Sequence, residues 1–217
     1  MPGDQRHGGR ASCRRLQGTG LSAGANRTDY VFAGNPSQGK PYKESDRPMP
    51  QGVYALTKWE GEQAAAQWPK HWIVRTCGLY ARREHAEAKN FVKTMLRLGS
   101  TRPQVQVVDD QACTPTYVPH LARAILYLSG VSAPAAAPFG IYHVTNRGAT
   151  TWRGFAAEIF RLAGLPVDVL PITTAQYGAP APRPAYSVLD TSAYHALGGP
   201  AMPGWEEVLG EYFSVAR

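Results

Sequence analysis

Tyr54-Ala-Leu-Thr-Lys58 lies between two short apolar segments, one ending in Thr28-Asp-Tyr-Val-Phe32 and the other reading His71-Trp-Ile-Val-Arg-Thr76. Each apolar segment has the length and composition of a buried strand. Between them, residues 54–68 are rich in Ala, Glu and Gln and predict a helix. Strand, helix and strand in this order form the βαβ unit of a parallel sheet, so this stretch predicts an α/β fold.

Tyr54 and Lys58 are the first candidate catalytic residues. Residues four apart lie on the same face of a helix, so the two side chains can point into one cleft. A nearby ammonium group favours the phenolate form of a tyrosine, which would allow Tyr54 to serve as a general acid or base. Thr28, at the neighbouring strand end, could hydrogen-bond the same substrate oxygen. A tyrosine four residues before a lysine also occurs by chance on solvated helices, and here the flanking strands favour catalysis.

Seven segments resemble, in the same order, the RmlD-like substrate-binding family of dTDP-4-dehydrorhamnose reductases, part of the extended short-chain dehydrogenase/reductase superfamily. These segments are residues 28–34, 41–46, 53–62, 90–97, 108–116, 140–145 and 183–190. They extend from Thr28 almost to the C-terminus. The resemblance implies a partial Rossmann-type parallel sheet with a small α/β substrate-binding lobe.

The resemblance also implies an activity, which is reduction of a nucleotide-linked 4-keto-6-deoxy sugar in dTDP-rhamnose biosynthesis. Hydride from NADPH or NADH would reach the sugar C4, and Tyr54 would supply the proton. Thr28, Tyr54 and Lys58 match the catalytic threonine, tyrosine and lysine of the family. Lys58 would also bind the nicotinamide ribose, and Arg75 and Thr76 match positions that flank the nicotinamide. A magnesium ion and a homodimer are left open.

Five further residues fall in motifs that line the sugar-nucleotide pocket of the family. They are Asp29, Tyr30, Asn90, Gln111 and Arg183. Arg183 suits a diphosphate, because a guanidinium group binds such anions through two parallel hydrogen bonds. The chain departs from the family pattern at Gly78, where relatives often carry tryptophan. The loss of this side chain predicts a wider pocket and a different sugar.

The first 27 residues are basic and glycine-rich, with no apolar run of strand length. We expect residues 1–27 to form a disordered tail and residues 28–217 to form the C-terminal portion of a Rossmann-type reductase. Gly18, Gly20 and Gly24 do not make a dinucleotide fingerprint, because no strand precedes them and no helix follows. The glycine-rich cofactor-binding part of the family is therefore expected to be missing.

Three interpretations follow for the chain as a whole. The first is a reductase that acts on its own. The second is a non-catalytic sugar-nucleotide-binding or regulatory subunit, related to the regulatory subunit of methionine adenosyltransferase. The third is a truncated gene product whose correct start lies upstream. The intact Thr28, Tyr54 and Lys58 favour the enzyme lineage.

The composition argues against several other classes of protein. The chain has 217 residues, 43% of them hydrophobic, which is enough for one substantial core. Its formal charge of +7 comes largely from arginines in the first 27 residues, and no basic-aromatic pattern predicts nucleic-acid binding. No segment reaches the ~20 apolar residues that span a membrane. We therefore expect a cytoplasmic protein with no nucleic-acid or membrane partner.

Cysteine and histidine usage predicts no metal site. The three cysteines, Cys13, Cys77 and Cys113, show no CxxC spacing, and the six histidines are scattered. We expect Cys77 and Cys113 to be small core or pocket-lining residues.

The remaining elements can be placed by periodicity and by loop composition. Helices are expected at residues 119–128, 151–163 and 205–216, strands at 105–108 and 141–144, and loops at 131–138 and 177–184.

Overall fold

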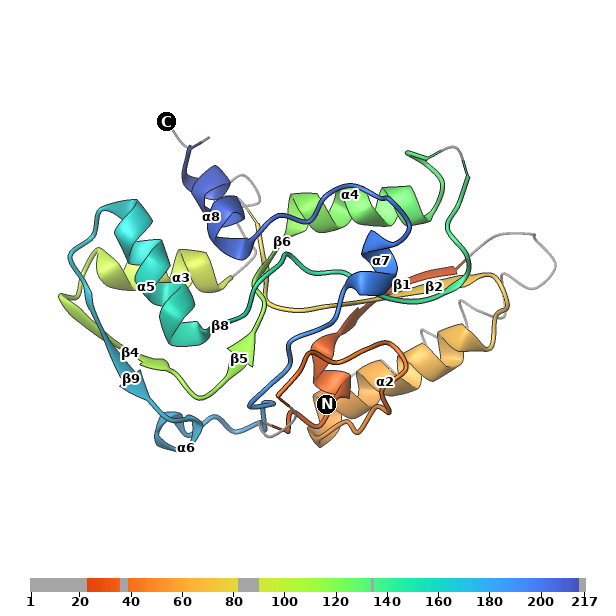
Figure 1. Cartoon of the computed structure of the whole chain (residues 1–217). Helices are drawn as coiled ribbons and strands as arrows, with labels where there is room; N and C mark the ends of the chain where they lie inside the picture. The colour runs from red at the N-terminus through yellow and green to blue at the C-terminus, as the bar shows by residue number, and fades with distance from the viewer. Residues whose placement is uncertain (1–22, 36–38, 82–89, 134, 215–217) are drawn as a thin grey trace, which may run out of the picture.

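The computed structural model describes residues 23–35, 39–81, 90–133 and 135–214 (Figure 1). The strands are β1 (Ala23–Thr28), β2 (His71–Thr76), β3 (Leu79–Tyr80), β4 (Gln104–Val108), β5 (Ala112–Cys113), β6 (Thr116–Tyr117), β7 (Gly140–His143), β8 (Thr150–Thr151) and β9 (Asp168–Ile172). The helices are the 3-10 turn η1 (Asp29–Val31) and α2 (Gly52–Ala66), α3 (Phe91–Gly99), α4 (Val118–Leu128), α5 (Trp152–Ala163), α6 (Thr174–Tyr177), α7 (Ser192–His195) and α8 (Trp205–Ser214).

A three-stranded parallel sheet forms the first lobe, with strand order β1-β2-β7. The helix α2 packs against β1 and β2 on one side, and α4 lies on the other side (Figure 1). Because β2 is central and covered on both sides, five of its six residues are buried. The predicted βαβ unit and the parallel sheet are confirmed.

The second lobe is built on the parallel pair β4 and β9. Figure 1 shows α3, α5 and α8 beside this pair, away from α2 and the three-stranded sheet. The helix α5 packs against α3, α8, β4 and β9, and its residues Phe155 and Ile159 are fully buried. This arrangement confirms the small α/β lobe that the resemblance implied.

The predicted helix at 151–163 illustrates how local chemistry fixes an element. The Thr151 side chain accepts a hydrogen bond from the Gly154 backbone N–H and caps the start of α5. The helix ends at Gly164, whose φ of +65° is a left-handed conformation that favours glycine. The predicted helices at 119–128 and 205–216 correspond to α4 and α8, although residues 215–217 lie outside the described part.

The start of the fold differs from the prediction in two ways. β1 begins at Ala23 instead of Thr28, because its backbone pairs in parallel with β2 over six residues, and this pairing does not require an apolar sequence. The strand also stops at Thr28, since Asp29–Val31 turns into the 3-10 helix η1, which the Thr28 side chain caps. Residues 1–22, most of the predicted tail, lie outside the described residues.

Two findings concern membranes and metals. Within the described residues, no helix has both the length and the apolar character needed to cross a membrane. Within the same residues, no group of three or more His, Cys, Asp or Glu side chains is placed to hold a metal ion.

Candidate active site

A cavity of about 740 Å³ opens where β1 and β2 end. The two strands are parallel and in register, with Thr28 opposite Thr76, so their carboxyl ends meet at this edge of the sheet. The cavity also takes residues from the second half of the chain. Its wall is made mainly by residues 27–30, 51–55, 76–79, 111–113 and 180–184. Crevices at the carboxyl ends of parallel strands are the usual ligand sites of open α/β sheets.

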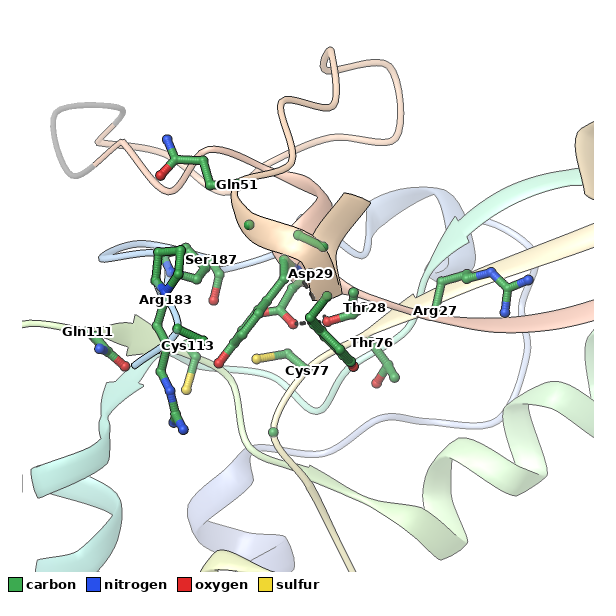
Figure 2. Close-up of a pocket in the computed structure, with 18 of the residues that line it drawn as sticks. Arg27, Thr28, Asp29, Gln51, Thr76, Cys77, Gln111, Cys113, Arg183 and Ser187 are labelled. Carbon is green, nitrogen blue, oxygen red and sulfur yellow. Dashed lines mark hydrogen bonds between the residues drawn. The ribbon is translucent and has the colours of Figure 1, made fainter. Parts of the chain in front are cut away.

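Thr28 is held at the cavity by hydrogen bonds at its side-chain oxygen. Thr28 Oγ1 accepts from the Tyr30 backbone N–H at 3.3 Å and donates to Asp29 Oδ1 at 3.1 Å. Figure 2 shows Thr28 and Asp29 side by side, joined by a dashed line. The turn η1 thus fixes the position of the Thr28 hydroxyl.

Tyr54 and Lys58 lie together at the start of α2. The Lys58 ammonium is 5.5 Å from the centre of the Tyr54 ring, which is the proximity that their spacing in the sequence predicts. The Tyr54 ring lines the cavity and is 53% exposed. The Tyr30 ring meets it edge-on, with 5.9 Å between ring centres and 82° between planes. Tyr54 is therefore accessible to a ligand, and the lysine charge lies within range of its ring.

Asp29 is a buried carboxyl group at the cavity wall, only 2% exposed. Burial raises its pKa, and the polar side chains of Ser187, Cys77 and Thr28 nearby partly oppose the rise. Its Oδ2 atom has no close hydrogen-bond partner among the described residues. The pKa of Tyr30 is also raised, first by burial and then by the neighbouring Asp29 charge.

Thr76, the last residue of β2, brings a second unsatisfied oxygen to the cavity. It is 4% exposed, and its Oγ1 has no hydrogen-bond partner within the described residues. Buried polar atoms are normally hydrogen-bonded, so Thr76 Oγ1 and Asp29 Oδ2 mark a site suited to a polar ligand. A nicotinamide and a sugar both carry groups that can supply such bonds.

The Arg75 side chain lies in the core and not at the cavity. It is 1% exposed, its Nη2 lies 2.8 Å from Glu62 Oε2, and its guanidinium lies over the Phe32 ring. Neighbouring residues of a strand point to opposite faces, so Arg75 faces α2 while Thr76 reaches the cavity. The Arg75 side chain therefore forms a structural ion pair away from the cavity lining, and its assignment to the cofactor stays a prediction.

The sequence held a signal for this pair that the prediction missed. Glu62 is four residues after Lys58 and eight after Tyr54, so it shares their helix face. An arginine inside an otherwise apolar strand needs a partner, because a buried charge without one is very costly. The two observations together point to a bond between Arg75 and Glu62.

The remaining predicted pocket residues separate into two groups. Gln111 and Arg183 line the cavity, and Gln111 donates a 2.8 Å hydrogen bond to Thr174 Oγ1. Arg183 is exposed and forms no ion pair within the described residues, so it is available to an anion. Asn90 does not line the cavity. It caps α3 by accepting from the Lys93 backbone N–H, and it donates to the Ala81 carbonyl.

Cys77, Cys113 and Ser187 complete this part of the wall (Figure 2). Both cysteines are free and buried, which confirms their prediction as core or pocket-lining residues. Ser187 was missed, although it lies within the 183–190 segment that carries Arg183.

The chain was compared with known proteins. The family model described as RmlD substrate binding domain matches residues 25–217. The chain is 43% identical over 189 residues to a dTDP-4-dehydrorhamnose reductase of Streptomyces griseus, with 86% of this chain and 60% of the relative covered. It is 41% identical to a spore coat polysaccharide biosynthesis protein of Bacillus subtilis, with 85% of this chain and 61% of the relative covered. The chain thus spans about three-fifths of the length of these relatives.

The fold also matches solved structures. The crystal structure of dTDP-4-dehydrorhamnose reductase from Bacillus anthracis in complex with NADP superposes with a TM-score of 0.86 and 38% sequence identity. The match covers 95% of this chain and 70% of that one.

Proposed function

Because the chain belongs to the RmlD substrate binding domain family, we propose that it carries the catalytic and sugar-binding part of an NADPH-dependent reductase. The substrate class is a nucleotide-linked 4-keto-6-deoxy sugar, as in dTDP-rhamnose biosynthesis. The observation that carries the proposal is the placement of Thr28 and Tyr54 at one cavity, with Lys58 beside the Tyr54 ring and two unsatisfied polar atoms in the cavity wall. The names of the relatives support the reaction, and the NADP in the Bacillus anthracis structure supports the cofactor.

The proposed chemistry converts a ketone to a secondary alcohol, which needs one hydride and one proton. When bound, a reduced nicotinamide supplies the hydride to the sugar C4. Tyr54 gives the proton of its hydroxyl to the C4 oxygen, on which negative charge develops. The Lys58 ammonium, 5.5 Å from the ring centre, stabilises the phenolate that remains on Tyr54.

Thr28 and Tyr30 orient the reacting groups in this proposal. The Thr28 hydroxyl, fixed by its bonds to η1, can turn its proton from Asp29 to the C4 oxygen. The Tyr30 ring packs edge-on against Tyr54 and limits the directions that the phenol can take. Both contacts fix the reacting groups before the reaction, so less conformational freedom is lost on reaching the transition state.

Ligand contacts divide between two sides of the cavity. We assign Lys58 and the unsatisfied Thr76 hydroxyl to the nicotinamide side, as the family resemblance implies. We assign Asp29, Gln111 and Arg183 to the sugar nucleotide, with Arg183 facing the diphosphate. Asn90 and Arg75 are left out of this assignment, because one caps a helix and the other is paired in the core.

The proposal extends to the setting of the protein. We place the reaction in the cytoplasm, in keeping with relatives named for sugar-nucleotide reduction and polysaccharide biosynthesis. Light scattering on the purified chain tests whether it forms a homodimer, and activity with and without a chelator tests the use of magnesium. The same names favour a reductase over a non-catalytic regulatory subunit.

The direct test is turnover. Purified chain is mixed with NADPH and a dTDP-linked 4-keto-6-deoxy sugar, and loss of NADPH absorbance is followed together with formation of the 4-hydroxy sugar by mass spectrometry. We expect oxidation of one NADPH for each sugar reduced. NADPH consumption without sugar product, or no turnover although both ligands bind, would contradict the proposal.

A further inference from the structure

Cys77 and Cys113 are two buried thiols that the proposed reaction does not use. Each is about 4% exposed, and both line the cavity. Cys77 directly follows β2 of the three-stranded sheet, whereas Cys113 ends β5, which pairs with β8 at the entry to α5. The cavity wall therefore receives one thiol from each half of the fold.

The backbone brings the two cysteines together. Immediately after them, β3 and β6 pair in parallel, with Leu79 opposite Thr116. The Thr116 N–H donates to the Gly78 carbonyl at 3.1 Å, so the chain segments that follow both cysteines lie side by side. Figure 2 shows both side chains in the same part of the cavity. A disulfide requires Cα atoms within about 7 Å of each other, and backbone segments that pair side by side bring cysteines into this range.

We propose that Cys77 and Cys113 form an oxidisable dithiol, which hydrogen peroxide converts into a disulfide that alters the cavity wall. In the first step, one cysteine sulfur attacks a peroxide oxygen, the O–O bond breaks and water leaves, giving a sulfenic acid. In the second step, the other sulfur attacks the sulfenic sulfur, the S–S bond forms, the S–O bond breaks and a second water leaves. Two thiols lose two electrons and two protons, and one peroxide becomes two waters.

The environment of the pair sets its reactivity. Contact with Cys113, burial and the nearby Asp29 charge together raise the pKa of the Cys77 thiol. Since the thiolate is the nucleophile, oxidation that begins at Cys77 is slow at neutral pH, and its rate rises about tenfold for each unit by which the pH increases towards that pKa. A small neutral peroxide suits the site, because it can enter the cavity and reach buried sulfur. A solvent-exposed thiol of ordinary pKa would react faster at neutral pH.

Peptide mapping after peroxide treatment tests the dithiol. The reduced chain and its Cys77→Ser, Cys113→Ser and Cys13→Ser variants are exposed to hydrogen peroxide, alkylated, digested without reductant and analysed by mass spectrometry. We expect a peptide linking Cys77 to Cys113 in the wild type and in Cys13→Ser, lost on adding dithiothreitol and missing from the other two variants. Sulfinic acid at either cysteine without the link, a link to Cys13, or no reaction at pH 9 would overturn the proposal.

The effect on ligand binding rests on the proposed function, whereas the disulfide does not. NADPH fluorescence titrations of reduced and oxidised wild type should show at least a tenfold loss of affinity on oxidation. Peroxide-treated Cys113→Ser, compared with its own reduced form, is the control and should show no loss. Equal affinity of reduced and oxidised wild type would refute the effect on the cavity. If the reduced chain binds no NADPH, the proposed function fails, while the peptide map still decides whether the dithiol exists.

Discussion

The two ends of α2 use the same helix face for opposite purposes. At its start, Tyr54 is 53% exposed at the cavity and has the Lys58 ammonium beside its ring. Two turns later, Glu62 is 1% exposed and binds Arg75 of β2. The buried end fastens the helix to the sheet, and the exposed end presents a reactive group in a fixed place. One helix thus links the stability of the sheet to the position of the proposed proton donor.

The largest expected effect comes from removing the Tyr54 hydroxyl at the exposed end of α2. Tyr54→Phe should lower the turnover rate by about 10²–10⁴-fold, the usual contribution of a general acid or base. Steady-state rates with NADPH and keto sugar measure the change. Tyr177→Phe is the matched control, because Tyr177 is similarly exposed, at 57%, and lies outside the cavity lining. Equal losses in both variants would contradict a catalytic role for Tyr54.

A substitution at the buried end of α2 should lower the free energy of unfolding. Glu62→Gln keeps the side-chain shape and leaves the Arg75 charge without its carboxylate, which should cost about 3–5 kcal/mol of unfolding free energy. Denaturant titration followed by circular dichroism measures the loss. Glu158→Gln is the control, since the Glu158–Arg161 pair lies at the surface and should contribute little. A Glu62→Gln variant as stable as the wild type would show that the pair does not anchor α2.

Acid should destabilise the fold through His143, which lies next to the buried Arg75. His143 is fully buried 3.4 Å from Arg75, and burial followed by the Arg75 charge lowers its pKa to about 4. The unfolded chain therefore binds the proton more tightly than the folded protein. The contribution of neutral His143 to the unfolding free energy is fully present above about pH 6.5 and is lost progressively as the pH falls towards 4. The unfolding free energy should fall by up to about 1.4 kcal/mol for each pH unit in this range, and His143→Gln should reduce this slope. His120, whose pKa is also lowered by burial, contributes in the same direction. An unchanged slope in His143→Gln would assign the effect to other groups.

The smallest effect completes the contrast between the two ends. Tyr54→Phe and Lys58→Met should each change the unfolding free energy by no more than about 0.5 kcal/mol, because neither side chain is buried in the core. Thermal and denaturant unfolding of both variants, alongside Glu62→Gln, gives the comparison. A large destabilisation by either would mean that the exposed end also supports the fold.

Sequence reasoning located most of the elements because their signals are local. The apolar run at 71–76, the capping Thr151 and the spacing of Tyr54 and Lys58 each depend on a few adjacent residues. The start of β1 at Ala23 could not be predicted in this way, since it depends on pairing with β2, more than forty residues away.

The candidate site likewise combines features that depend on neighbouring residues with features that depend on residues distant in the sequence. The proximity of Tyr54 and Lys58 is a property of one helix and was predicted correctly. The direction of the Arg75 side chain depends on Glu62 and on strand alternation, and Asn90 serves the end of α3 instead of the cavity. The placement of Cys77 and Cys113 in one part of the cavity wall follows from the pairing of β3 with β6, which the local sequence around either cysteine does not reveal.

The central claim is that Tyr54 and Lys58, at the exposed end of α2, form part of a site that binds a nicotinamide cofactor. A fluorescence titration of NADPH against the wild type, Lys58→Met and the exposed control Lys70→Met tests it most directly. The account predicts saturable binding by the wild type and by Lys70→Met, with affinity at least tenfold weaker in Lys58→Met. Equal binding by all three proteins, or no saturable binding by the wild type, would contradict it.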